Sequence, residues 1–152
     1  MCALATVAPS SGGSAAVTAL GTGNSAVNIG NGPNVVSAVG AFDMAGNYAN
    51  AGPGAPNRVT ANGLGVSAYN TVGQGNTVTS TGVENIASNI LGNNNVVSAS
   101  GSFDNIAFNI AGNNNNIAAG PNGPLAIAGA FASSNNYGPN SIVQNGTGIK
   151  IK

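Results

Sequence analysis

Apolar and polar residues alternate with a period of two in short runs along this chain, as in Asn95-Val96-Val97-Ser98-Ala99-Ser100-Gly101. Alternation of this kind places successive side chains on opposite faces of an extended strand. The 3.6-residue period of an amphipathic helix is absent, and the poor helix formers Gly and Asn are frequent. The pattern therefore predicts an all-β protein built from short strands.

The run that contains Val97 recurs along the chain, each time centred on a β-branched residue. These residues are Val17, Val36, Val59, Val78, Val97, Ile117 and Ile142, with spacings of 19, 23, 19, 19, 20 and 25 residues. The longer spacings contain Gly- and Pro-rich sequence at 52–56 and 121–139, which predicts loop insertions there. A repeat of this length indicates one supersecondary unit per repeat and a stacked solenoid.

The first half of each unit predicts a strand whose inner face is small and apolar. The β-branched residue is followed two positions later by Ala or Ser and, in most units, four positions later by Gly. Asn precedes it by two positions in most units. Parallel stacking brings equal positions to about 4.8 Å, so that amides in such a row can hydrogen-bond along the stack. The expected structural ladder consists of Asn34, Asn57, Asn76, Asn95 and Asn115.

The second half of each unit repeats Ala-x-Asn and predicts a second strand. Its Asn row is Asn28, Asn47, Asn70, Asn89 and Asn109. The alternation leaves open which face is buried. We favour inward Ala and Asn, because the first strand offers only small residues as a partner layer. The larger residues would then form an exposed stripe, and such stripes mark interaction surfaces. This candidate interaction stripe is Ile29, Tyr48, Tyr69, Ile90, Phe108 and Ile110.

Together these patterns predict a two-sheeted parallel β-solenoid, or β-helix, of about seven coils with internal Asn and Ala ladders, over residues 15–152 as one domain. Residues 1–14 are expected to be a flexible N-terminal segment. Because Ala3-Leu4-Ala5 has the small-x-small form of a signal-peptidase site, the segment is alternatively a signal-peptide remnant. The run 147–152 alternates apolar and basic residues and is either a capping edge strand guarded by Lys150 and Lys152 or a frayed end.

Composition removes several function classes. Three acidic and three basic residues give a net charge of zero, so there is no electrostatic case for binding nucleic acid or an anionic membrane. No apolar run reaches the roughly 18 residues of a membrane span. With no His and one Cys, neither a His/Cys metal cluster nor a Ser-His nucleophile is available. We expect no cofactor.

The three acids offer the only constellation that resembles a catalytic one. Asp43, Glu84 and Asp104 lie six or seven residues after the β-branched residues, at the same corner of three coils. Catalytic carboxylates need a paired acid on the same or the next coil, and the coils of Asp43 and Glu84 are separated by another. We interpret the acids as solvated turn residues and expect a non-enzyme with no catalytic site.

Two stretches of the sequence resemble binding sites of other solenoids. The turn Gly21-Thr22-Gly23-Asn24-Ser25 is similar to that of calcium-binding nonapeptide solenoids, but Ser25 replaces their Asp, so no metal site is predicted. Thr77, Thr79 and Thr81 share an outward face and resemble solenoid antifreeze proteins, although on one coil only. A flat sheet presented to ice, or to a glycan through its aromatic residues, remains the alternative function.

The units at 92–101 and 112–120, with their Gly-Asn-Asn-Asn turns, resemble the Asn/Gly/Ala-rich repeats of secreted or surface proteins of mycobacteria and related actinobacteria. The resemblance covers residues 17 to about 149 and implies an exported, non-enzymatic protein. We therefore expect a secreted or cell-surface structural protein, a rod that mediates self-assembly or adhesion. Its partner would be itself, as a homo-oligomer or filament, or a cell-surface component.

Overall fold

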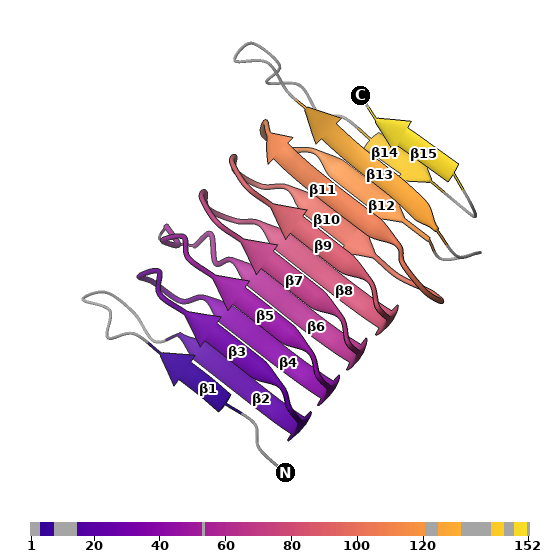
Figure 1. The fold of residues 1–152 in the computed structure, drawn as a ribbon. Helices are drawn as coiled ribbons and strands as arrows, with labels where there is room; N and C mark the ends of the chain where they lie inside the picture. The colour runs from indigo at the N-terminus through magenta and orange to yellow at the C-terminus, as the bar shows by residue number, and fades with distance from the viewer. Residues whose placement is uncertain are drawn as a thin grey trace.

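The computed structural model describes residues 4–7, 15–52, 54–120, 125–131, 141–144 and 148–151, which form two parallel β-sheets (Figure 1). The odd sheet contains β1 (Leu4–Val7), β3 (Ser25–Asn28), β5 (Met44–Asn47), β7 (Ser67–Asn70), β9 (Ile86–Asn89), β11 (Ile106–Ala111), β13 (Ala126–Phe131) and β15 (Gly148–Ile151). The even sheet contains β2 (Ala16–Thr22), β4 (Val35–Ala41), β6 (Arg58–Leu64), β8 (Thr77–Val83), β10 (Val96–Ala99), β12 (Asn116–Ala119) and β14 (Ser141–Gln144).

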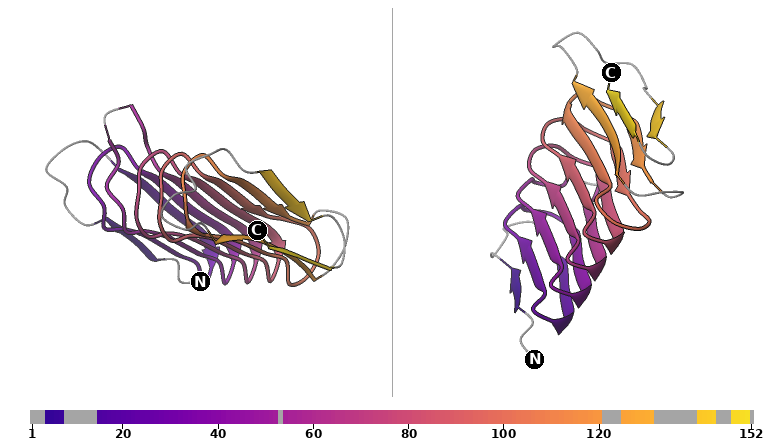
Figure 2. Two further views of the ribbon diagram at one scale, coloured as in Figure 1. Left: turned by 90° about the horizontal axis from the view of Figure 1, so that it is seen from above. Right: turned by 45° about the vertical axis from the view of Figure 1, so that its right-hand side comes forward.

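Successive strands alternate between the sheets, and each pairs in parallel with the strand two places along the chain. The coils thus stack along one axis, with β1 and β15 at opposite ends (Figures 1 and 2). The predicted two-sheeted solenoid is confirmed, although it makes about six turns and not about seven coils. The seventh predicted coil, centred on Ile142, is described only over β14 and β15.

The interior consists of small side chains held in register from coil to coil. Val97 pairs with Val78 on one side and Ile117 on the other, and all three are fully buried. On the opposite wall Ala87 pairs with Ala68 and Ala107, also fully buried. The preference for inward Ala in the second strand is therefore confirmed. Small residues on both inner faces leave no room for larger ones between the sheets.

Both predicted Asn ladders lie inside. In the second strand each Nδ2 donates to the Oδ1 one coil earlier, at 2.7–2.8 Å, from Asn47 on Asn28 through to Asn109 on Asn89. In the row before the even strands, Oδ1 accepts the backbone N–H of the next Asn, as Asn76 Oδ1 does from Asn95 at 3.0 Å. No side-chain polar atom that is buried among the described residues lacks a hydrogen-bond partner, as burial without water requires.

A third ladder, which the sequence analysis missed, fills the corner between each even strand and the next odd strand. Asn85 Oδ1 accepts the N–H of Asn105 at 2.9 Å, and Asn105 Oδ1 accepts that of Ala126 at 3.0 Å. One coil earlier the aligned residue is Val66, and before it Asp43. The residues share the 19 to 23-residue spacing of the repeat, which was the available signal.

Two segments that were expected to be irregular contain strands. Leu4–Val7, part of the stretch expected to be flexible, forms β1 and pairs with β3. The insertion expected at 121–139 contains β13, while 121–124 and 132–139 lie outside the described residues. At the insertion of 52–56, Ala55 donates to the Gly52 carbonyl at 3.1 Å and closes a tight turn.

The run at 147–152 contributes β15, an edge strand of the odd sheet as one of the two interpretations required. The register of β15 does not place Lys150 in an outward row, as a charged residue that protects the sheet edge would require. Lys150 pairs with Ala128, whose row faces the interior, while Ile149 and Ile151 continue outward rows and are 69% and 51% exposed. Lys152 lies outside the described residues.

Candidate interaction surface

The outer face of the odd sheet carries a row of large apolar side chains where the strands begin. Met44, Ile86, Ile106, Ile127 and Ile149 occupy one register position, with Ser67 between the first two. Met44, Ile86 and Ile149 are 46%, 41% and 69% exposed. This row was not predicted, because the expected stripe consists of the larger residues that follow Ala and Asn, whereas the row lies one residue before Ala.

The corner beside this row continues the apolar surface. Each coil places one residue in the left-handed backbone conformation just before the inner ladder position, with φ between 54° and 70°. Phe42 and Leu125 stand there and are 62% and 56% exposed; Leu64 and Phe103, one residue earlier in their coils, are 48% and 53% exposed. We call the following nine residues the apolar strip: Phe42, Met44, Leu64, Ile86, Phe103, Ile106, Leu125, Ile127 and Ile149.

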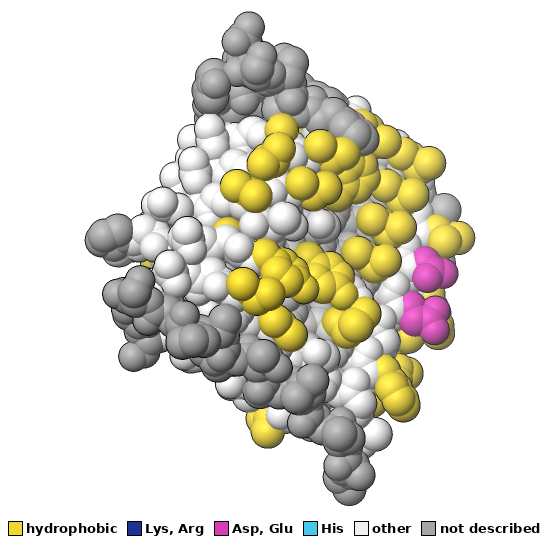
Figure 3. Space-filling view, turned by 60° about the vertical axis from the view of Figure 1, so that its left-hand side comes forward, with side chains coloured by type: hydrophobic (Ala, Val, Ile, Leu, Met, Phe, Trp, Pro, Cys, Tyr) yellow, Lys and Arg dark blue, Asp and Glu magenta, His cyan; other side chains and the backbone are white. Residues whose placement is uncertain are grey.

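Figure 3 shows apolar side chains gathered over one face of the molecule and along its edge, where acidic groups lie among them. The residues that occupy the left-handed corner position indicate whether the side chains along that edge have a use. Gly23 and Gly65 fill it in two coils, where glycine adopts the conformation without strain. An L residue pays about 1–2 kcal/mol there, yet Phe42 and Leu125 occupy it with their side chains in solvent. Strained positions of this kind are retained where the side chain is used.

The acids divide between the outside and the inside of this corner. Glu84 and Asp104 stand at the left-handed position on neighbouring coils and are exposed. Asp43 occupies the inner ladder position instead and is fully buried, so its interpretation as a solvated turn residue is wrong. Its carboxylate accepts the backbone N–H of Gly63 at 2.9 Å and of Val66 at 3.0 Å. A structural role in the corner accounts for it, and it does not face the two exposed acids.

The predicted interaction stripe lies on the same outer face, at the other end of the strands. Ile29, Tyr48 and Ile90 are 54%, 47% and 40% exposed, whereas Tyr69, Phe108 and Ile110 are half-buried. The six residues belong to two neighbouring rows that smaller residues interrupt.

Glycines explain why the aromatic members of the stripe are partly covered. A Cβ on Gly46 would lie 3.0 Å from both the Tyr48 and the Tyr69 ring, and a Cβ on Gly129 would lie 2.1 Å from the Phe108 ring. The rings therefore lie over glycines of their own or neighbouring coils.

The even sheet presents an outer face on which small residues are frequent. Thr18, Ser37, Thr60, Thr79 and Ser98 form one row of hydroxyl-bearing side chains in register. The flanking position of Thr77 carries Arg58 on one neighbouring coil and Val96 on the other. The Thr rank of an ice-binding face is thus confined to one coil, as the sequence pattern indicated.

The described residues were compared with the requirements of a metal site and of a membrane-spanning helix. They include no group of three or more His, Cys, Asp and Glu side chains placed to hold a metal ion. Within the turn at 21–25, Asn24 is buried and its Oδ1 accepts the Asp43 N–H at 2.9 Å, so this side chain belongs to the inner ladder. None of these residues lies in a helix of the length and apolarity that a membrane crossing requires. No family model, curated protein or solved structure matches the chain.

Proposed function

We propose that this protein is a non-enzymatic structural protein that associates with further copies of itself through the apolar strip. One observation carries the proposal. No Phe, Tyr, Leu or Met whose side chain is described is buried, and the largest fully buried side chain is that of Ile117. Globular proteins most often bury Phe, Leu and Met. Here the interior holds Val, Ala and Asn, and the large apolar groups cover the outside.

A second copy is the partner that this surface fits best. The strip runs along the coils over the outer face of the odd sheet and the adjoining corner, and the outer faces of two sheets can pack with aligned strands about 10 Å apart. Three charges of each sign provide no strong net repulsion between copies. Exposed apolar side chains gathered on one side of a protein are typical of association sites.

The place of action that we propose is outside the cell, secreted or at the bacterial cell surface. The support is the resemblance of the Asn/Gly/Ala-rich units to exported repeat proteins. A cell-surface component is the second partner to test. Fractionation of the source organism into cytosol, envelope and medium, with detection by an antibody, tests the location directly.

Light scattering after size exclusion, repeated from micromolar to millimolar protein, tests self-association. We expect the mass to rise with concentration, and Ile86→Ser with Phe103→Ser to keep the chain monomeric. The matched control is Leu20→Ser, since Leu20 is 58% exposed but belongs to β2 in the even sheet. A wild-type chain that is monomeric at about 1 mM, where only associations weaker than about 4 kcal/mol would escape, contradicts the proposal.

An enzymatic function makes a different prediction. Turnover of a polysaccharide that Asp104→Asn abolishes would replace the structural assignment. Asp104 is the informative choice because it is exposed and occupies the corner position that Glu84 occupies on the neighbouring coil.

A further inference from the structure

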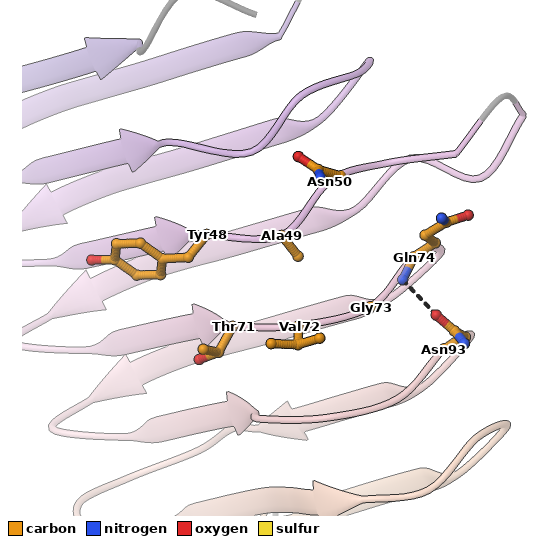
Figure 4. A pocket seen from close by; sticks show the side chains of 8 residues that line it. All are labelled: Tyr48, Ala49, Asn50, Thr71, Val72, Gly73, Gln74 and Asn93. Atoms are coloured by element: carbon orange, nitrogen blue, oxygen red, sulfur yellow. Dashed lines mark hydrogen bonds between the residues drawn. The ribbon is translucent and has the colours of Figure 1, made fainter.

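A depression on the outer surface lies where strands β5, β7 and β9 end, on the side of the odd sheet away from the apolar strip (Figure 4). Its lining is mixed. Tyr48 and Val72 supply apolar surface, and Asn50, Thr71, Gln74 and Asn93 supply amide and hydroxyl groups. The lining contains no charged side chain.

Tyr48 lies at one end of the depression, and Figure 4 shows its ring pointing away from Asn50, Gln74 and Asn93. The ring lies over Gly46, because a Cβ there would come within 3.0 Å of Cε2 and 3.3 Å of the hydroxyl. It is 47% exposed. An aromatic ring held in this way offers a flat apolar surface together with a polar hydroxyl.

The two Asn side chains are oriented by the neighbouring coils. Asn50 Oδ1 accepts the backbone N–H of Asn31 at 2.8 Å, and Asn93 Oδ1 accepts that of Gln74 at 2.8 Å, the bond drawn in Figure 4. Both side chains are exposed. Because each oxygen is engaged, each amide presents its Nδ2 donors to the surroundings in a fixed direction. Donors fixed before a ligand arrives cost less entropy on binding.

We propose that this depression binds a neutral saccharide. In a chain of sugar residues, one ring can place its apolar C–H face on the Tyr48 ring, while hydroxyls of its neighbours meet the oriented amide donors and the Thr71 hydroxyl. A lining without cations does not compensate a phosphate or carboxylate, and the polar groups would remain unpaired against a purely apolar ligand. The site is independent of the apolar strip, so its test does not depend on self-association.

Electrophoresis through native gels that contain a soluble neutral polysaccharide tests the proposal. The probes are hydroxyethylcellulose, galactomannan and dextran, each used separately. We expect at least one to retard the protein. Tyr48→Ala should weaken that binding by about tenfold, as expected for the loss of an aromatic contact, while Tyr48→Phe should retain most of it. Tyr69→Ala is the matched control, because Tyr69 also lies over Gly46 but does not line the depression.

A second pair of variants separates hydrogen bonding from general surface change. Asn93→Asp keeps an oxygen for the Gln74 N–H but removes the outward donors, so retardation should fall about fivefold. Asn113→Asp is its control, since Asn113 Oδ1 accepts the Asn93 N–H at 2.7 Å outside the depression. Absence of retardation by all three polysaccharides overturns the proposal. Equal losses in Tyr48→Ala and Tyr69→Ala, or in the two Asp variants, overturn it as well.

Discussion

The inside of this solenoid repeats from end to end, whereas some outer positions repeat over only part of its length. The inner position of Val97 is Val or Ile from β2 to β14. The outer position of Ile86 carries Ser25, Met44 and Ser67 on the earlier coils and Ile106, Ile127 and Ile149 on the later ones. An inner side chain is confined by coils above and below and by the facing sheet, so one size fits. An outer side chain has solvent before it, and its identity is free to serve binding.

The inner ladders should be the most sensitive part of the molecule. Asn89 Nδ2 donates to Asn70 Oδ1 at 2.8 Å, so Asn89→Asp would set one acceptor against another and bury an unpaired charge. We expect a loss of about 3–5 kcal/mol in the free energy of unfolding. Denaturant unfolding followed by circular dichroism measures it. The control is Asn62→Asp, an exposed outward position on β6, which should change little; similar effects at both positions would contradict the comparison.

The thinness of the interior gives the next largest effect. Ala87 is fully buried between Ala68 and Ala107, and Leu in its place would force the sheets apart. Ala87→Leu should cost about 3 kcal/mol, the upper range for overpacking a core. The neighbouring Ser88 points outward from the same strand, so Ser88→Leu should stay within about 0.5 kcal/mol. Thermal unfolding of the two variants gives the difference, and a reversed order would mean that the strand faces the other way.

Asp43 is a charged residue type in an inner row that carries Asn in most other coils. Its carboxylate accepts two backbone N–H groups, one from Gly63. In the preceding coil Asn24 Nδ2 instead donates to the Gly40 carbonyl at 3.0 Å, with Gly40 at a φ of 134°. Gly63 does not share that positive φ. It therefore presents its N–H to the corner, where a carboxylate can accept it, and not its carbonyl.

Asp43→Asn should therefore cost about 1–2 kcal/mol, because an amide donor would meet the Gly63 N–H. The cost is limited if Gly63 turns to the conformation of Gly40 and offers its carbonyl. Denaturant unfolding measures the loss, and the backbone chemical shifts of Gly63 report the turn. Unchanged stability together with unchanged shifts would show that the carboxylate is dispensable. Gly63→Ala is not a usable control, since its Cβ would lie 2.0 Å from the Gly82 carbonyl oxygen.

The same contrast explains what the sequence could predict. Period-two alternation and a 19 to 20-residue spacing were sufficient for the strands, the parallel stacking and two Asn ladders, because stacking repeats the same requirement in each coil. The third ladder was not predicted, because Asp43 and Val66 interrupt its Asn series and the series lies in a corner and not in a strand. The left-handed corner escaped because Phe42 and Leu125 are residue types that usually avoid positive φ.

The candidate sites were harder to predict because they belong to the irregular outside. Tyr48 was expected to point outward, and it does, but the amides beside it come from the corners of three different coils. Their proximity follows from the stacking of loops whose sequences differ. A repeat register aligns positions in strands, and it does not indicate which outer side chains gather into a surface. The apolar strip combines two rows, one in the strand and one in the corner, that no single period describes.

The smallest expected effect on the fold is the sharpest test of the outside. Phe42 has a φ of 60°, and Gly23 and Gly65 occupy its position in the adjacent coils. Phe42→Gly should leave the free energy of unfolding of the monomer unchanged or raise it by up to about 1 kcal/mol, because relief of the strained conformation offsets the loss of the ring that lies over Gly23. The same variant should weaken self-association, because it removes a side chain of the apolar strip that is 62% exposed. Unfolding is measured at a concentration where the chain is monomeric, and association by sedimentation at higher concentration. A strip that existed only to complete the fold would give the opposite result: a less stable monomer with unchanged association.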